Sequence, residues 1–246
     1  MPEPRVALVT GAGRGIGLAV VQRLLADGSR CGALEISERA IAGAREALAA
    51  HAGDVEYIAG SVVDPEQAES CVSHLIARWG RLDVLVNNAA VNRPGGLFEQ
   101  RQEDWDAVIA VNLTGPFVMS RAAAARMRDQ GEGAIVHIGS IGAAGMGASP
   151  AYASSKAGLI GLTRQMASEL GPSGIRVNYV APGVTLTDWV ERNLLPENIE
   201  ASAANSPLRR VGTPEDIAGV VAFLCSADAR HVTGQVISAS GGAWMP

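Results

Sequence analysis

The stretch TGAGRGIGLAV, Thr10 to Val20, decides the fold of this 246-residue chain. It follows an apolar run at residues 5–10 and opens a helical pattern, so its glycines lie in a turn between a strand and a helix. Free N–H groups at the start of such a helix can hold a pyrophosphate. The spacing G-x-x-x-G-x-G departs from the dinucleotide fingerprint G-x-G-x-x-G, and a purely structural turn is the alternative. Because a strand precedes it and a helix follows, the stretch predicts dinucleotide binding.

Away from this turn, short β-branched runs alternate with helical patterns to the end of the chain. Continuous apolar strands separated by helices indicate a parallel sheet with helices on both faces. We therefore predict one α/β domain over residues 1–246, a doubly wound parallel sheet of about seven strands in the order 3-2-1-4-5-6 with a seventh at the edge. The strands are expected at 5–10, 31–35, 55–59, 83–87, 134–139, 175–180 and 235–239, and the helices at about 15–27, 38–51, 65–79, 104–129, 151–170 and 214–226.

One segment, 187–208, interrupts this alternation. It is rich in Asn, Pro and Ser and precedes the sequence SPLRRVGTPEDI. Such content indicates local mobility, so we expect a substrate lid that is ordered by substrate or cofactor. A rigid surface excursion is the alternative.

Composition excludes several classes of function. The net charge of −5 and the isoelectric point near 5.4 argue against nucleic acid or an anionic membrane as a partner. No apolar run reaches the roughly 18 residues of a spanning helix, and the start MPEPRVALVTG has no signal-peptide pattern. The cysteines and histidines show neither disulfide nor metal-ligand spacing: Cys31, Cys71, Cys225, His51, His74, His137 and His231. We expect a cytoplasmic protein without a metal.

Polar residues follow several of the expected strands. Glu35 ends the second strand, roughly where an acidic residue binds the adenosine ribose hydroxyls, although a solvated charge is the alternative. In a parallel sheet the carboxyl ends of the strands meet at one ligand crevice. The same edge is expected to carry Asn87 to Ala90, Ser140, Pro182, Gly183, Thr185 and Thr187.

The stretch PAYASSKAGLIG, Pro150 to Gly161, places a phenol and an ammonium four residues apart among small side chains. On a helix Tyr152 and Lys156 share one face. A nearby cation favours the phenolate, so the phenol becomes easier to deprotonate. The pair alone is weak evidence, because this spacing occurs by chance on many exposed helices.

Together these motifs resemble the short-chain dehydrogenase/reductase family, and the resemblance covers essentially the whole chain. TGAGRGIG, NNAA in place of the usual Asn-Asn-Ala-Gly, Asn112, Ser140, YASSK and NYVAPG occur in the expected order. The resemblance implies a Rossmann-type subunit, a nicotinamide cofactor and a catalytic tetrad of Asn112, Ser140, Tyr152 and Lys156.

The implied roles are chemically reasonable. Tyr152 would be the general acid/base, and a phenolate at neutral pH requires a pKa depressed by about three units, roughly 4 kcal/mol. Lys156 and the cationic ring of the oxidised cofactor would lower the pKa of Tyr152 by this amount. Lys156 would also bind the nicotinamide ribose. Ser140 would orient the substrate oxygen, and Asn112 would hold a water that connects Lys156 to solvent.

The resemblance also implies a set of binding residues. Ser61 stands where the family often has Asp or Asn to contact the adenine, and Ala90 replaces the usual Gly. The cofactor is expected to contact Gly11, Arg14, Gly15, Ile16, Gly17, Glu35, Ser61, Val62, Asn88, Ala89, Tyr152, Lys156, Pro182, Gly183, Thr185 and Thr187. The substrate is expected to contact Asn92, Ser140, Met146, Tyr152 and Trp189.

The leading functional hypothesis is an NAD-dependent alcohol dehydrogenase or ketone reductase. A 3-oxoacyl thioester reductase using NADP(H) is the main alternative, although docking an acidic carrier protein requires a basic patch and only Arg126 and Arg128 suggest one. A non-catalytic dinucleotide-binding regulator and a sugar-nucleotide epimerase are weaker alternatives. NAD is favoured over NADP because the Glu35 carboxylate would repel the 2′-phosphate of NADP. Ile36 follows Glu35, at a position where NADP-dependent members of the family often have Arg. The positive charges of Arg14 and Arg39 would offset part of this preference for NAD.

Self-association is the last expectation. The helices expected at 104–129 and 151–170 are rich in Ala and Gly, more than an exposed surface helix requires. Related enzymes pair these helices between subunits, so a homotetramer is expected, or at least a dimer. Packing of both faces on the sheet is the alternative.

Overall fold

Seven parallel strands form one sheet in the order β3-β2-β1-β4-β5-β6-β7 in the computed structural model, which describes residues 3–245. Every strand pair is parallel, so each connection crosses a face of the sheet. The predicted order with its seventh edge strand is confirmed. The strands are β1 (Val6–Thr10), β2 (Arg30–Glu35), β3 (Val55–Ala59), β4 (Val84–Asn87), β5 (Gly133–Ile138), β6 (Ile175–Pro182) and β7 (Val236–Ala239).

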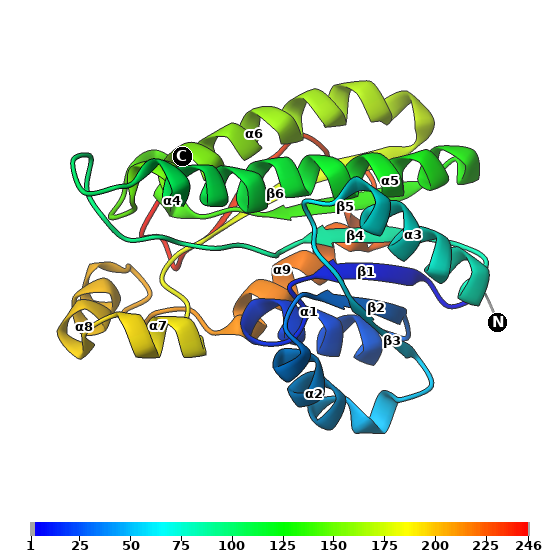
Figure 1. Ribbon diagram of the computed structural model, residues 1–246, viewed down its shortest axis with the longest axis horizontal. Helices are drawn as coiled ribbons and strands as arrows, with labels where there is room; N and C mark the ends of the chain where they lie inside the picture. Colours follow the sequence, from blue (N-terminus) through cyan, green and yellow to red (C-terminus); the bar gives the residue numbers. More distant parts are fainter. Residues whose placement is uncertain (1–2, 246) are drawn as a thin grey trace.

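Helices cover both faces of the sheet (Figure 1). One layer contains α1 (Gly15–Ala26), α2 (Glu38–Ala47) and α9 (Pro214–Cys225), and the opposite layer contains α3 (Pro65–Trp79), α4 (Gln102–Ile109), α5 (Gly115–Gln130) and α6 (Pro150–Leu170). The helix predicted at 104–129 begins earlier and contains a π-helical turn at Ala110–Thr114. Such turns are frequent at functional sites, and this one carries Asn112.

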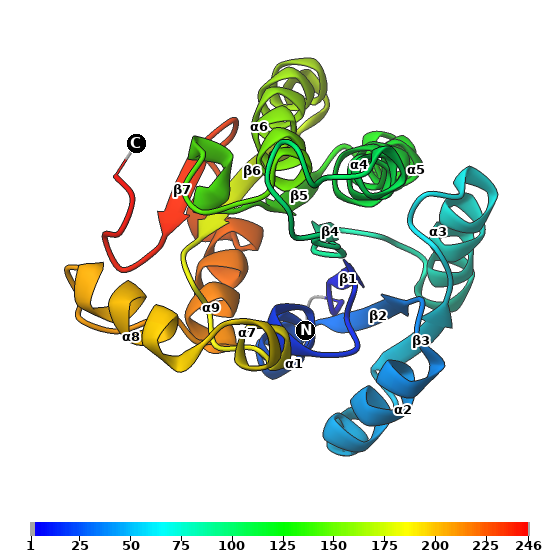
Figure 2. The same cartoon turned by 60° about the vertical axis from the view of Figure 1, so that its left-hand side comes forward.

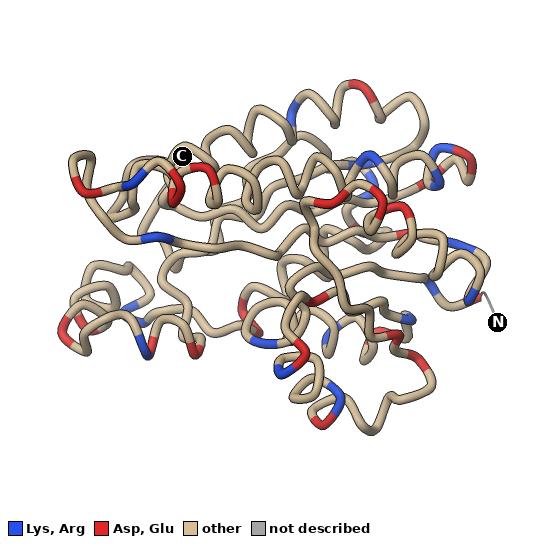
Figure 3. The backbone as a smooth tube through the Cα atoms, viewed as in Figure 1, with Lys and Arg blue, Asp and Glu red and all other residues tan. Residues whose placement is uncertain are grey.

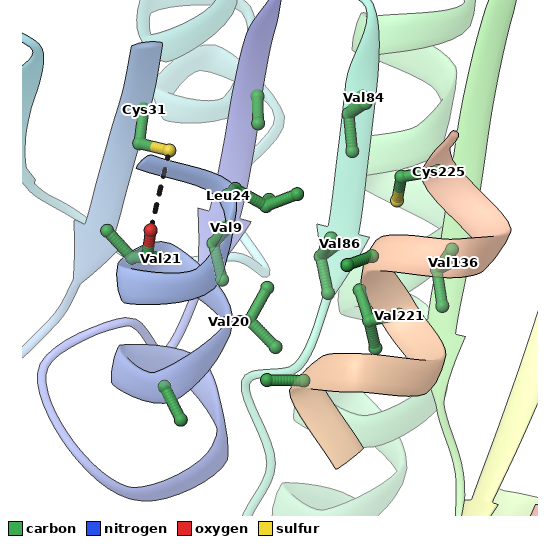
Figure 4. Close-up of a cluster of buried hydrophobic side chains, with 14 of the residues drawn as sticks. Val9, Val20, Val21, Leu24, Cys31, Val84, Val86, Val136, Val221 and Cys225 are labelled. Atoms are coloured by element: carbon green, nitrogen blue, oxygen red, sulfur yellow. Dashed lines mark hydrogen bonds between the residues drawn. The ribbon is translucent and has the colours of Figure 1, made fainter. Parts of the chain in front are cut away.

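The core contains one large cluster on each face of the sheet and a small third cluster of Leu159, Tyr179 and Ala181. Figure 4 shows the first, in which valines of β1, β4 and β5 pack against Val20 and Val21 of α1 and Val221 of α9. All three cysteines are buried and free. Burial raises the pKa of Cys71 and of Cys225 to about 12, so they pack as small apolar groups.

Capping side chains set the start of most helices. Asp64 accepts the N–H groups of Glu66 and Gln67 at the start of α3, and Ser149 accepts that of Tyr152 at the start of α6. Thr213 and Asp216 form a reciprocal capping box on α9. At the start of α1 the Arg14 side chain makes no capping bond, and α4, α5 and α8 also begin without a side-chain cap. Helix α1 presents its first N–H groups to whatever lies beyond the glycine turn.

The segment predicted as a lid forms two short helices, α7 (Asp188–Asn193) and α8 (Pro196–Asn205). Figures 1 and 2 show them projecting beside the start of α9. Within 187–208 only Val190 and Ser206 are buried. The segment therefore contributes little to the core.

One helical stretch among residues 3–245, Gln102–Gln130, is long and apolar enough to cross a membrane by length and composition alone. Its most apolar window is 56% buried within the protein. Met119, Ala123 and Met127 on this stretch belong to the core cluster beneath it. Its apolar face is therefore explained by packing on the sheet.

Candidate active site

The glycine turn after β1 is shaped for close approach by a ligand. Gly11 and Gly15 have φ values of 62° and 53°, a region that L side chains rarely adopt. A Cβ on Gly17 would collide with the Gly11 carbonyl, and one on Gly11 would lie 2.8 Å from Ala89 Cα. Because no side chain fills the turn and α1 is uncapped, an anionic pyrophosphate fits here.

The end of β4 fixes this turn in place. The Asn88 side-chain amide donates to the carbonyls of Thr10 and Gly11, both at 2.9 Å. In return, Thr10 Oγ1 accepts the N–H groups of Asn88 and Ala89 at 3.0 Å each. The Asn88 amide is therefore committed to the loop, and any contact to the cofactor must use its other atoms or the Ala89 backbone.

Glu35 ends β2 beside the glycine turn, as predicted. Its Oε2 accepts the Gly13 N–H at 3.2 Å, and its Oε1 accepts those of Ile36 at 2.9 Å and Ser37 at 3.1 Å. Each carboxylate oxygen has about two acceptor positions, so Oε2 keeps one for a ribose hydroxyl. Three amides thus hold the carboxylate in a fixed orientation.

The predicted adenine contacts lie after β3. Val62 is buried, and the Ser61 hydroxyl accepts the Val63 N–H at 3.4 Å while its own proton remains available. The Ser61 N–H itself is taken by Gln67. The position suits an adenine contact through the hydroxyl, which stays a prediction.

Three of the four tetrad residues converge where β5 ends and α6 begins. Lys156 is 2% exposed, donates to the Ile138 carbonyl at 2.8 Å, and its Nζ lies 5.6 Å from the centre of the Tyr152 ring. Ser140 follows β5 directly, and its hydroxyl lowers the pKa of Tyr152. The predicted grouping of Ser140, Tyr152 and Lys156 is therefore present in the structure.

Burial raises the pKa of Tyr152 above its ordinary value, and the hydrogen bond with Ser140 offsets only part of this rise. The expected lowering of this pKa by Lys156 together with the oxidised cofactor stays a prediction. Burial lowers the pKa of Lys156 to about 8, so the ammonium is still the main form at neutral pH.

Asn112, the fourth tetrad residue, is fully buried in the π-helical turn. Its Oδ1 accepts the Val91 N–H at 2.8 Å, and its Nδ2 donates to the Val91 carbonyl at 2.9 Å and to Ser155 Oγ at 3.3 Å. The side chain thus ties the β4–α4 loop to α6. A water would have to use the remaining acceptor position of Oδ1 or the Asn112 backbone, and that role stays a prediction.

The turn after β6 approaches the glycine loop. A Cβ on Gly15 would lie 3.3 Å from the Thr187 methyl group, and the two residues line one open cavity between α1 and α7. The Thr185 hydroxyl donates to the Gly183 carbonyl at 3.1 Å, so this side chain stabilises the turn. Cofactor contacts by Pro182, Gly183, Thr185 and Thr187 stay predictions.

The predicted substrate residues lie on three separate segments. Asn92 accepts the Ser149 hydroxyl at 3.3 Å, one turn from Tyr152, whereas Met146 and Trp189 are 46% and 41% exposed. Ser149 was missed by the sequence analysis, although Ser before Pro is a typical start of a helix. No group of three or more His, Cys, Asp or Glu side chains within residues 3–245 is arranged to hold a metal ion.

Comparison with known proteins agrees with this geometry. A family model described as enoyl-(acyl carrier protein) reductase matches residues 11–243. The 3-oxoacyl-[acyl-carrier-protein] reductase FabG of Thermotoga maritima is 40% identical over 242 residues, 98% of each chain, and that of Escherichia coli K12 is 37% identical over 244 residues, 99% of this chain and 98% of the other. The crystal structure of gox2181 matches with a TM-score of 0.91 at 33% identity, covering 98% of this chain and 97% of that one. The chain belongs to the short-chain dehydrogenase/reductase family of nicotinamide-dinucleotide-dependent oxidoreductases.

Proposed function

We propose that this protein is an NAD-linked dehydrogenase or reductase that interconverts a secondary alcohol and a ketone. The observation that carries the proposal is the buried Lys156 ammonium beneath Tyr152, next to Ser140, at the sheet edge that also holds the glycine turn. A non-catalytic dinucleotide-binding regulator has no need of this arrangement.

The residues divide the chemistry between them. The nicotinamide cofactor supplies or accepts the hydride at the carbinol carbon. Tyr152, neutral because burial raises its pKa, donates its phenolic proton to the oxygen during ketone reduction. Ser140 orients that oxygen, and Lys156 lies beneath the phenol as the nearby ammonium that stabilises the phenolate. For alcohol oxidation the Tyr152 phenolate accepts the proton, and a bound oxidised cofactor would add a positive charge that favours this phenolate.

Glu35 supports NAD over NADP. Two unit charges about 4 Å apart repel by roughly 4 kcal/mol at an effective dielectric near 20, and half of that corresponds to about thirtyfold in affinity. Hydrogen bonds from three backbone N–H groups prevent the Glu35 carboxylate from turning away from a 2′-phosphate. Arg14 and Arg39 are exposed and oppose this preference in part.

The cofactor preference is tested by comparing kcat/KM for NADH and NADPH with one ketone. Wild type should favour NADH by about thirtyfold, and the Glu35→Ala, Ile36→Arg double variant should shift the ratio toward NADPH. Glu46→Ala, which removes an exposed carboxylate on α2, is the matched control and should keep the wild-type ratio. A wild type that prefers NADPH would contradict the assignment of Glu35 to the ribose.

A second candidate is reduction of a 3-oxoacyl thioester, which is favoured by the similarity to the 3-oxoacyl-[acyl-carrier-protein] reductases of Thermotoga maritima and Escherichia coli. The charges of this chain argue against delivery by an acidic carrier protein. The lid segment carries four carboxylates, Asp188, Glu191, Glu197 and Glu200, and one guanidinium, Arg192 (Figure 3). Arg126 and Arg128 lie at the end of α5 that leads into the start of β5, the sheet edge opposite Tyr152. We therefore favour a free small-molecule substrate.

A paired activity screen separates the two candidates. Small ketones, secondary alcohols and polyols form one arm, and acetoacetyl thioesters of a short mimic and of an acyl carrier protein form the other. Our proposal expects turnover of free substrates and no gain from the carrier. A kcat/KM at least tenfold higher for the carrier-bound thioester would replace it with the second candidate.

Three further expectations belong to this proposal. Segment 187–208 acts as the substrate lid, which is supported by its sparse burial and by the contact of Thr187 with the glycine turn. Self-association, to a homotetramer, is supported by the exposed small residues Ala157, Gly158 and Gly161 on α6 and by the half-exposed Phe117 on α5. The third expectation is a cytoplasmic location.

A further inference from the structure

Tyr179 of β6 is fully buried, yet all partners of its hydroxyl are backbone atoms of two catalytic residues. It accepts the Ser140 N–H at 2.9 Å. Its O–H donates a shared hydrogen bond to the carbonyl oxygens of Ser140, at 3.2 Å, and Lys156, at 3.3 Å. One phenol therefore joins the end of β5 to the first turns of α6.

The space for this phenol is created by Gly139. A Cβ at this position would overlap the Tyr179 ring, so any other residue would displace either the ring or the strand end. The Gly139 N–H donates to the Val180 carbonyl at 2.7 Å, which keeps the strand end close to β6. Gly139 and Tyr179 thus form a complementary pair immediately before Ser140.

A second buried side chain fixes α6 in the same way. His137 and Tyr179 are register partners on β5 and β6. The Thr163 hydroxyl donates to the Leu159 carbonyl at 2.7 Å, so it accepts the proton of His137 Nδ1 at 2.9 Å. Lys156 and Thr163 are seven residues apart and lie on one face of α6. Two bonds, two turns apart, therefore set the position of α6 along the sheet.

This placement matters because Tyr152 lies one turn before Lys156 on the same helix. A shift of α6 relative to the end of β5 would change the distance between the Tyr152 and Ser140 hydroxyls. Both must reach one substrate oxygen, and misplacement of reacting groups by about 1 Å can cost about a hundredfold in rate. Burial raises the pKa of Tyr179, so it remains a neutral phenol that both donates and accepts.

We propose that Tyr179, seated on Gly139, is a positioning residue that sets the distance between Ser140 and the Tyr152–Lys156 pair. The proposal rests on the function proposed above. It differs from a simple core role because the ring fills space, whereas the hydroxyl bonds the backbones of Ser140 and Lys156, in addition to the bond from Lys156 Nζ to the Ile138 carbonyl.

The test is Tyr179→Phe, which keeps the ring and removes the hydroxyl. We expect kcat to fall about tenfold or more, with the KM for cofactor changed less than twofold. Thr233→Val is the matched control. It removes a hydroxyl that bonds Val177 at the other end of β6 and should keep the wild-type kcat. An unchanged kcat in Tyr179→Phe, or an equal loss in the control, would overturn the proposal.

Hydrogen exchange separates this proposal from the proposed function. The Ser140 amide should exchange faster in Tyr179→Phe than in wild type, whatever the substrate. If wild type turns over no alcohol or ketone, the proposed function fails, and the exchange rate of Ser140 still decides whether Tyr179 holds this strand end. Equal exchange in both proteins would overturn the positioning role.

Discussion

The two halves of the carboxyl edge of the sheet are built from different materials. Around β1 and β2, the site consists mainly of backbone groups, namely the uncapped N–H groups of α1 and glycines without side chains. The one side chain is the Glu35 carboxylate, which accepts hydrogen bonds from three backbone amides. Around β5 and β6, buried side chains do it: Lys156, His137 and Tyr179 are each 2% exposed or less. In the proposed function, the first half would bind the cofactor and the second would carry out the reaction.

The difference explains where pKa values are perturbed. The backbone amides that form most of the cofactor half do not titrate. Burial lowers the pKa of Lys156 to about 8 and that of His137 to about 3, and it raises that of Tyr152. Changes in the reacting half should therefore alter kcat and pH dependence, whereas changes in the binding half should alter cofactor affinity.

The largest expected effect is in the reacting half. Tyr152→Phe keeps the ring and removes the proton carrier, so kcat should fall by at least the ~10² typical of general acid–base catalysis. The dissociation constant of the cofactor should stay within a few fold. Tyr57→Phe, on β3, is the matched control and should keep full activity. Near-normal turnover of Tyr152→Phe would break the assignment.

Gly17→Ala tests the binding half. The new methyl group would collide with the Gly11 carbonyl and the Asn88 amide. Overpacking of about 1–3 kcal/mol corresponds to a roughly tenfold to hundredfold rise in the dissociation constant of the cofactor, with kcat at saturation largely kept. Gly43→Ala on α2 meets open space and should instead stabilise the fold by about 0.5–1 kcal/mol. Equal cofactor affinity in both variants would contradict the close approach at Gly17.

A smaller effect is expected for His137, a buried side chain outside the proposed reaction, on the pH dependence of stability. His137 has a pKa of about 3 in the folded protein because of burial and, next, the Lys156 charge. Between about pH 6.5 and 3 the unfolded chain takes up a proton that the folded protein refuses, so stability falls with falling pH by up to about 1.4 kcal/mol per unit.

Urea unfolding at pH 6 and pH 5 measures this slope. His137→Asn should reduce it, and His231→Asn, at an exposed histidine, should keep the wild-type slope. Identical slopes for wild type and His137→Asn would show that His137 is not held neutral.

Hydrogen exchange of segment 187–208 should show the smallest change. Its backbone should be protected more strongly with cofactor than without it, because Thr187 lies against Gly15 at the pyrophosphate position. Equal protection in both states would indicate a rigid excursion rather than a lid.

The sequence predicts the binding half well because its signals are local. Glycines that precede a helix, and an acidic residue such as Glu35 that ends a strand, can be identified from a few neighbouring residues. The alternation of strands and helices predicts the sheet order. The Tyr152–Lys156 spacing is local too. In contrast, the bond from Tyr179 to Ser140 joins residues 39 positions apart, and only the strand register brings them together.

For the same reason the pKa values of the reacting half are harder to predict. The expected depression of the Tyr152 pKa depends on Lys156 and the oxidised cofactor together. In the structure, Lys156 donates to Ile138, and burial acts on both groups. Burial and hydrogen-bond competition depend on the packed protein and leave no pattern in a single sequence.

The central claim is that the two halves cooperate in hydride transfer, with Tyr152 as the proton donor. The most direct test is single-turnover reduction of an accepted ketone with NADH carrying deuterium at C4. Wild type should place deuterium on the carbinol carbon of the product, and Tyr152→Phe, saturated with the same cofactor, should do so at least about a hundredfold more slowly. Absence of deuterium at that carbon in the wild-type product, or equal rates for both proteins, would contradict the account.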